Sequence, residues 1–415
     1  MVSDIADYAS VGTVLREILS AVPSPRSEVL FAEDAYGRVA SEDVLAPEDV
    51  PPGNASLMDG FAVRSRDTAD ASESHACLLP VVGEVALAEQ PSVKVRGPAA
   101  IRVSTGSLLP SWADAVVPVE NTSVTESGVA LRTPVGQGNF VYEAGSDARK
   151  GAVAIRRGET IRAQEVGLAL TIGVRRIRVF KKPTVAILAT GNELVDSSVR
   201  VRKTGMKNSH APVFVRLIRQ LGCEPLSLGI APDDRRMIRA GIGKGLAKAD
   251  LVLTTGGTSM GMLDLVGGVV ASFGPRKMFH GVKMDRGRVT GVALVGHKPI
   301  VMMPGPIQGA TNAFLLFGVP IMRKLSGVVG GEALVRAKLT TPWAARARFP
   351  NFTKVAYVSV SRDTDGAKAE IVTGESESMS LLTRANGFVV VPEETASLPE
   401  GSDVNVLLLP GFSFA

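Results

Sequence analysis

The chain has 415 residues, too many for one hydrophobic core, which predicts two to four domains. Its composition, 45% hydrophobic and 21% charged, is typical of a soluble globular protein. The net charge of +5 is spread along the chain and aromatic residues make up only 5%, so we expect no nucleic-acid partner. Cys77 and Cys223, the only cysteines, exclude a disulfide framework and a cysteine-based zinc site.

We expect neither a signal peptide nor a membrane-spanning segment. The first residues, 1–10, include acidic side chains and lack an apolar stretch. The longest apolar candidate, 313–322, is too short to cross a bilayer and contains Gly318 and Pro320. We therefore expect a cytoplasmic protein with no membrane partner.

The predicted type of secondary structure changes twice in the N-terminal part of the chain. Residues 11–22 and 29–44 have helical spacing, and a proline-rich crossing follows them. Short apolar runs separated by turn residues then indicate a small all-β domain. Beyond it, short strands and a helix at 165–172 return to the character of the N-terminal segment. We predict a linking domain formed by 1–50 and 145–180, with a β domain at 51–144 inserted into it.

A regular alternation of strand-like and helix-like segments begins at Pro183. It predicts βαβ units with right-handed crossovers and a mainly parallel sheet. The loops 190–193, 255–264 and 303–306 then converge at one edge, where such sheets bind ligands. We predict an α/β domain at 181–327 and a strand-rich β domain at 328–415.

The loop 255–264 has the composition of an anion site. Two adjacent glycines, Gly256 and Gly257, let the backbone approach a ligand, and a predicted helix N-terminus follows. An ordinary β-to-α turn has the same residues, so both interpretations stay open. Asp264 at the end of the loop would repel an anion, unless a metal or a proton lies between them.

Charged residues at other strand ends add candidate chemistry. Lys283 and Arg286 follow a predicted strand, where cations can neutralise phosphate beside a metal held by Asp264. A solvated charged turn would have the same residues. Glu193 suits a ligand, a metal or the cap of a helix N-terminus. The four histidines lack metal-binding spacing, and 241–245 lacks the pattern of a P-loop.

Seven motifs, in family order over nearly the whole chain, resemble the MoeA-type molybdopterin molybdenumtransferases, the family that includes the gephyrin E domain. They are Ser56–Val63 (SLMDGFAV), Ile101–Gly106 (IRVSTG), Ala113–Val117 with Glu120, Gly145–Asp147, Val185–Leu194 (VAILATGNEL), Thr254–Gly261 (TTGGTSMG) and Pro304–Gly305. Each motif is weak alone, whereas the ordered set is specific. The resemblance implies a multidomain α/β plus β fold. Its parts are an elongated linking domain with an inserted β domain, a molybdopterin-binding three-layer α/β domain, and a C-terminal β-barrel-like domain.

The resemblance also implies a reaction and its site. The chain would insert molybdate, or tungstate, into adenylylated molybdopterin with Mg²⁺ and release AMP, as a step of molybdenum cofactor biosynthesis. Binding would involve Thr105, Thr190, Gly191, Asn208, Gly256, Gly257, Thr258, Ser259, Gly261, Pro304 and Gly305. Catalysis would involve Asp59, Asp147, Glu193, Asp264, Lys283 and Arg286, with Glu193 and Asp264 as metal ligands.

The implied partners are the pterin substrate, a second copy of the chain and other proteins of cofactor biosynthesis. Family members are dimers whose active site is shared between subunits. Asp59 and Thr105 would therefore reach the site from the partner subunit.

The chain departs from the family pattern at several positions. Met262 replaces an acidic residue, Met284–Gly287 replace the last four residues of a KPGKP-like loop that starts at Lys283, Pro306–Ile307 replace the end of PGNP, Asn192 replaces an aspartate, and Tyr142 replaces an arginine. Arg286 keeps the charge of the family's lysine with a different geometry. Two hypotheses follow. One is an active transferase, and the other is a weakened or inactive paralogue that binds pterin or nucleotide or acts as a dimeric scaffold.

Overall fold

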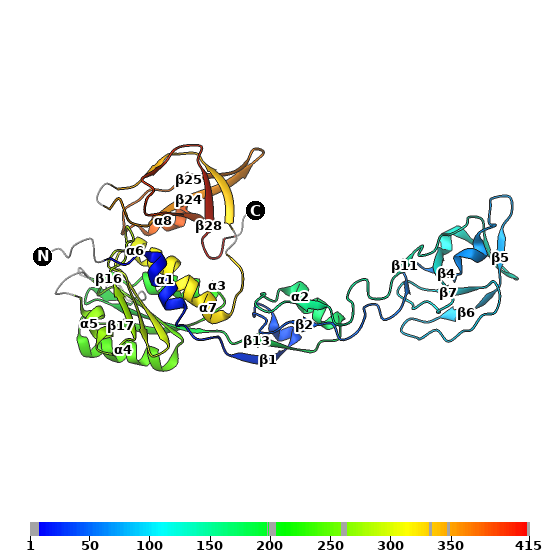
Figure 1. Ribbon diagram of the computed structural model, residues 1–415, viewed down its shortest axis with the longest axis horizontal. Helices are drawn as coiled ribbons and strands as arrows, with labels where there is room; N and C mark the ends of the chain where they lie inside the picture. Colours follow the sequence, from blue (N-terminus) through cyan, green and yellow to red (C-terminus); the bar gives the residue numbers. More distant parts are fainter. Residues whose placement is uncertain are drawn as a thin grey trace. The chain divides into compact units, whose positions relative to one another are not determined.

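The computed structural model describes residues 8–196, 198, 205–258, 264–331, 334–346 and 349–412. The chain forms two compact units (Figure 1). Unit 1 comprises Met1–Glu28, Gly37–Ser41 and Val179–Ala415, and unit 2 comprises Val29–Tyr36 and Glu42–Arg178. Within the described ranges, no helix has the length and apolar character that crossing a membrane requires.

Unit 1 contains a six-stranded sheet in the order β17-β14-β18-β21-β20-β19. The parallel strands are β17 (Glu224–Ala231), β14 (Thr184–Thr190), β18 (Leu251–Thr255) and β21 (Lys298–Met303). The strands β20 (Gly291–Val295) and β19 (Lys277–His280) add an antiparallel edge. All five residues of β18 are buried, which is typical of a parallel strand covered on both faces.

Helices cover both faces of this sheet, as alternate residues of β14 show. Val185 and Ile187 pack in one core with α1 (Val11–Leu19), α3 (His210–Gln220), α6 (Ile307–Ala313) and α7 (Val319–Ser326). Ala186 and Leu188 pack in a second core with α4 (Arg235–Lys248) and α5 (Leu265–Ala271) (Figure 1). The three-layer α/β arrangement is therefore confirmed.

The last helical segment of the α/β domain, from α6 to α7, is continuous but irregular. Between α6 and α7 the segment η5 (Phe314–Gly318) has π-helical pairing. Pro320 lacks an N–H group and its ring displaces the carbonyl four residues before it, which accounts for the wider turn. Gly327 ends α7 with a φ of +72°, a conformation that favours glycine.

The C-terminal part of unit 1 is a closed five-stranded barrel, as predicted. Its strands follow the order β22-β25-β24-β26-β28. They are β22 (Leu334–Leu339), β24 (Lys354–Asp363), β25 (Gly366–Ile371), β26 (Gly387–Val391) and β28 (Asp403–Leu408), with the helix α8 (Met379–Arg384) beside them. Along β24, Ala356 and Val358 fill the barrel. Val355 and Tyr357 instead pack with the helices of the α/β domain, so the barrel shares a core with that domain.

Unit 2 is mainly β structure. One sheet has the order β6-β7-β4-β8, with bounds Val81–Val85, Ala100–Val103, Gly60–Val63 and Ala115–Pro118. A second sheet has the order β5-β10-β9, with bounds Cys77–Leu79, Gly128–Leu131 and Thr122–Thr125. The pairs β2 (Val44–Leu45) with β12 (Val153–Ile155) and β3 (Ala55–Ser56) with β11 (Val141–Tyr142), and the helix α2 (Ala163–Thr171), complete the unit.

The predicted helix at 29–44 is wrong. The segment forms the strand β1 (Ser27–Phe31), which pairs with β13 (Arg176–Phe180), and then the 3₁₀ turn η2 (Ala32–Ala35). Gly37 has a φ of +71°, which ends any helical path. The helical spacing covered little more than one turn, too short a stretch to outweigh the strand's hydrogen bonds to a distant partner.

Candidate functional site

A cavity of about 270 Å³ lies at the carboxyl ends of the parallel strands. Thr190, Gly256 and Gly305, which follow or end β14, β18 and β21, all line it. Glu193 and Asn208 complete the predicted residues at its wall. The parallel register of the three strands places these loops together, although they are far apart in the sequence.

The loop after β18 lies directly against the end of β14. Gly256 and Gly257 have φ values of +87° and +64°. A Cβ atom on Gly257 would lie 2.5 Å from Thr190 Oγ1 and 2.8 Å from Val266 Cγ2, and one on Gly256 would overlap the Thr190 carbonyl oxygen. The backbone therefore passes through a space that only glycine fits, and it leaves the peptide groups close to the cavity.

Thr190 gives this cavity a polar group that has no protein partner in the described structure. The residue is 1% exposed, and its Oγ1 makes no hydrogen bond to any described residue. A buried hydroxyl without a partner costs free energy. The arrangement therefore fits a ligand that brings hydrogen-bonding groups to the end of β14.

Glu193 lies in the turn between β14 and the strand β15 (Leu194–Val195). Its exposed carboxylate folds back over Gly191, where an added Cβ atom would lie 2.5 Å from Oε1. This position is not a helix N-terminus, so the capping interpretation does not apply. Asn208 does cap a helix, since its Oδ1 accepts a hydrogen bond from the Ala211 N–H at 3.2 Å in the first turn of α3.

Asp264 is engaged by protein groups on both carboxylate oxygens. As the N-cap of α5, its Oδ1 accepts a hydrogen bond from the Gly267 N–H at 3.0 Å. Its Oδ2 lies 3.2 Å from Nδ1 of His280. The described residues contain no group of three or more His, Cys, Asp or Glu that could hold a metal ion. A metal at Asp264 would have to compete with these partners.

The segment 283–286 faces the C-terminal barrel. The Lys283 N–H donates to the Ala9 carbonyl at 2.8 Å, and the Lys283 carbonyl accepts from the Thr353 N–H at 2.9 Å. The Arg286 guanidinium donates to Gln308 Oε1 and, at 2.7 Å, to the Gly374 carbonyl. Among the described residues that line the 270 Å³ cavity, neither Asp264 nor Lys283 nor Arg286 occurs.

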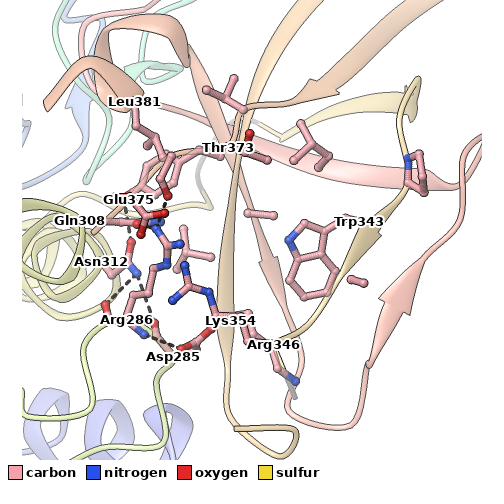
Figure 2. A pocket seen from close by; sticks show the side chains of 18 residues that line it. Asp285, Arg286, Gln308, Asn312, Trp343, Arg346, Lys354, Thr373, Glu375 and Leu381 are labelled. Carbon is pink, nitrogen blue, oxygen red and sulfur yellow. Dashed lines mark hydrogen bonds between the residues drawn. The ribbon is translucent and has the colours of Figure 1, made fainter. Parts of the chain in front are cut away.

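Arg286 instead lines a second cavity of about 480 Å³ between the α/β domain and the barrel (Figure 2). Figure 2 shows Asp285, Arg286 and Lys354 gathered on one side of it and Trp343 on the other. Arg346 adds a further cation to its lining. Asp285 and Glu375 are the acidic residues of the described lining, against the three cations Arg286, Arg346 and Lys354, so the cavity has a small excess of positive charge that favours an anion.

Two charged groups in the second cavity are withdrawn from solvent, Lys354 fully and Asp285 in part. Lys354 is 2% exposed, and its ammonium donates to the carbonyls of Pro350, Glu393 and Thr395 at 2.6, 2.9 and 3.1 Å. Burial lowers the pKa of this ammonium. Burial also raises the pKa of the Asp285 carboxyl, although Arg346 and Lys354 act in the opposite direction.

The remaining predicted residues belong to unit 2. The Asp59 carboxylate accepts hydrogen bonds from the N–H and the hydroxyl of Thr105 at 2.7 and 3.0 Å. These bonds lower the pKa of Asp59, so its carboxylate stays ionised at neutral pH. Asp147 is exposed in a turn, where its N–H donates to the Val50 carbonyl at 3.0 Å.

In the glycine-rich loop, the Thr258 hydroxyl donates a hydrogen bond to the Met303 carbonyl at 3.4 Å. Pro304 follows β21 and is buried. Ser259, Gly261 and Met262 lie outside the described residues.

Several residues at the site carried no prediction. His210 and Glu377 line the first cavity. Asp233 follows β17 and exchanges hydrogen bonds with Asn192, at 3.0 Å to Asn192 Oδ1 and 3.3 Å to Asp233 Oδ2. Glu193 was predicted because it follows a strand of the parallel sheet, and the same reasoning applied to β17 would have identified Asp233. No local pattern marks Glu377, because it reaches the cavity from the C-terminal domain.

Replacing Gly257 by alanine should destabilise the chain by about 1–3 kcal/mol, because the new Cβ meets Thr190 and Val266 at a positive φ. Urea denaturation of the full chain measures this free energy of unfolding. Gly243→Ala in α4 is the control, since its added Cβ meets nothing closer than 3.8 Å. Equal stability of the two variants would contradict the described packing.

Replacing Asp285 by asparagine should raise the thermal stability of the chain more at about pH 7 than at about pH 4. Folding raises the pKa of the Asp285 carboxyl, so the folded chain holds this proton more tightly than the unfolded chain. As the pH rises from the unfolded pKa to the folded pKa, ionisation of Asp285 therefore lowers the stability of the folded chain. The melting temperatures of the two proteins across this range measure the effect. The exposed Asp403→Asn should show no such trend, and a trend of the opposite sign for Asp285→Asn would refute this assignment.

Three models of protein families match successive parts of the chain. The MoeA N-terminal region, domains I and II, matches residues 9–173. A probable molybdopterin binding domain matches 186–324, and the MoeA C-terminal region, domain IV, matches 336–409.

Individual relatives match over nearly the full length. The molybdopterin molybdenumtransferase of Bacillus subtilis strain 168 is 30% identical over 96% of this chain and 94% of its own. Molybdopterin molybdenumtransferase 2 of Mycobacterium tuberculosis is 28% identical over 90% of this chain and 92% of its own. A crystal structure of a MoeA protein from Pyrococcus horikoshii covers 98% of this chain and 100% of its own, with a TM-score of 0.84 and 29% identity. The chain belongs to the MoeA family of molybdopterin molybdenumtransferases.

Proposed function

We propose that this chain inserts molybdate, or tungstate, into adenylylated molybdopterin and releases AMP during molybdenum cofactor biosynthesis. The observation that carries the proposal is the unpartnered Thr190 hydroxyl beside a loop that only Gly256 and Gly257 fit. Close backbone approach and an unused hydroxyl are what a pterin with a phosphate group requires. The names of the full-length relatives point to the same reaction.

The first cavity is the proposed pterin-phosphate site. Gly256, Gly257 and Thr258 of its glycine loop would face the phosphate. Ser259 and Gly261, outside the described residues, are further proposed binding residues. Thr190, Gly191 and Asn208 on one side and Pro304–Gly305 on the other would hold the pterin. His210 and Glu377, which line the same wall, would add ring-edge hydrogen bonds.

Hydrolysis of the phosphoanhydride would add water across its bridging P–O bond, release AMP, leave the phosphate on the pterin and increase the negative charge on both groups. Glu193, exposed at the cavity, would hold the Mg²⁺ that neutralises this charge. Asp264 is the second proposed metal ligand. To bind a metal ion, its carboxylate would have to give up its contact with His280 or its hydrogen bond from Gly267. Lys283 would supply a further positive charge near the leaving phosphate.

The second cavity is the proposed site of the oxyanion substrate. Arg286, Arg346 and Lys354 provide positive charge there, and Asp285 and Glu375 limit it. Lys354 already donates to three carbonyls, so it acts as a fixed charge and not as a free donor. Folding raises the pKa of the Asp285 carboxyl, because burial disfavours its charged form.

The proposed reaction takes place in a cytoplasmic homodimer. Asp59 and Thr105, which are hydrogen-bonded to one another, would come from the partner subunit. Asp147 is a further proposed catalytic carboxylate. Interaction with other proteins of cofactor biosynthesis belongs to the same proposal. In the described part of the chain the cavity and its glycine pair are present, which favours a transferase over a scaffold.

Replacing Glu193 by glutamine should reduce Mg²⁺-dependent AMP release by about tenfold or more, since a neutral amide binds the cation poorly. The assay uses the purified full chain with molybdate, Mg²⁺ and adenylylated molybdopterin. Glu370→Gln, at an exposed position of the barrel, should leave the rate unchanged.

An Asp264→Asn variant tests the second ligand in the same assay. An unchanged rate would remove Asp264 from the mechanism. Absence of AMP release by the unaltered chain would refute the proposed reaction.

A further inference from the structure

A third cavity, of about 560 Å³, lies at the opposite ends of the strands from the ligand loops. It is lined by residues 23–26, by 181–184, which lead into β14, by His297 and Lys298 at the start of β21, and by Asp250 and Leu325. Among the described residues, none lines both this cavity and either of the two described above. It is therefore a separate site on unit 1.

The lining is strongly cationic. Arg26, Lys181, Lys182 and Lys298 supply four positive charges, and Asp250 supplies the single carboxylate among the described lining residues. That carboxylate is already engaged, since Oδ2 accepts from the Thr184 N–H at 2.8 Å and Oδ1 lies 3.8 Å from the Arg26 guanidinium. Like charges held close together repel, and a bound anion would relieve the repulsion.

The backbone that carries these charges is constrained. Pro23, Pro25 and Pro183 fix φ in both segments of the lining. The Lys181 N–H donates to the Arg26 carbonyl at 2.8 Å, which ties one segment to the other. The cations are thus presented by a framework that needs little ordering before a ligand binds.

The chemistry of the lining selects among anions. Lysine ammonium groups on flexible stems act as point charges for phosphate and adapt to several oxygens. The Lys298 ammonium already donates to the Leu246 carbonyl at 2.6 Å, while Lys181 and Lys182 are exposed at the cavity. Among the described lining residues there is no Phe, Tyr or Trp to stack on a base. The phosphates of a ligand, and not a ring, would therefore provide the affinity.

We propose that this cavity binds a small anion that carries two or more linked phosphate groups. Inorganic pyrophosphate and the phosphate chain of a nucleoside diphosphate or triphosphate share this chemistry. The volume lies in the range of about 300–1,000 Å³ that is usual for small-molecule sites. The proposal is independent of the transferase reaction, since it concerns none of the residues assigned to that reaction.

Calorimetric titration of the full chain with inorganic pyrophosphate, at fixed ionic strength, tests the proposal. The double variant Lys181→Gln, Lys182→Gln should weaken binding by about tenfold or more, because two phosphate contacts are lost. The control double variant Lys244→Gln, Lys338→Gln removes two exposed lysines outside the cavity and should change affinity by less than about twofold. Equal losses in both variants, or no binding by the unaltered chain, would overturn the proposal.

Two further titrations locate the site and identify the ligand chemistry. Arg286→Gln, in the second cavity, should retain the binding that depends on Lys181 and Lys182. Loss of all pyrophosphate binding in Arg286→Gln would move the site to that cavity and refute the proposal. Orthophosphate should bind more weakly than pyrophosphate, and equal affinities would indicate an adventitious ion only.

The double variant at Lys181 and Lys182 should keep the AMP-release rate of the unaltered chain. This result separates the phosphate site from the transferase reaction. Loss of AMP release in this variant would contradict the independence of the two sites.

Discussion

The candidate site depends on one close approach, that of the Gly256–Gly257 backbone to the end of β14 at Thr190. The space between them admits no Cβ atom, as the distances from Gly257 to Thr190 and Val266 show. Parallel pairing of β14 with β18 sets this distance, and α5 begins only after the loop. A shift of either strand would separate the peptide groups of the loop from the Thr190 hydroxyl and from the cavity that both of them border.

The loop that follows β19 extends this constraint to the barrel. The Lys283 carbonyl accepts a hydrogen bond from the Thr353 N–H, and the Arg286 guanidinium donates to the Gly374 carbonyl. This loop therefore connects the α/β domain, which contains the first cavity, to the barrel, which forms part of the second. The buried Tyr357 hydroxyl donates to Asn312 Oδ1 at 2.7 Å and thereby ties β24 to α6. Asp285 and Arg286 of this loop line the second cavity, whereas Gly256 lines the first.

Much of the fold could be predicted because buried parallel strands are apolar runs and their loops must meet at one edge. Thr190, Gly256 and Gly305 follow from this rule. Three features could not be predicted. The strand pairing of β1 depends on residues about 150 positions away. The Asp264 carboxylate at the N-terminus of α5 contacts His280 of β19. The Lys354 ammonium donates to the carbonyls of Glu393 and Thr395, about 40 residues further along the chain. Such contacts arise only when the chain is folded, so no local pattern encodes them.

Hydrogen exchange of the full chain with and without adenylylated molybdopterin tests the central claim most directly. We expect slower exchange of the backbone amides in the peptides that span 190–193 and 255–258, because a ligand in the first cavity covers both loops. Protection confined to unit 2 or to the segment 181–184, with those two peptides unchanged, would contradict the claim.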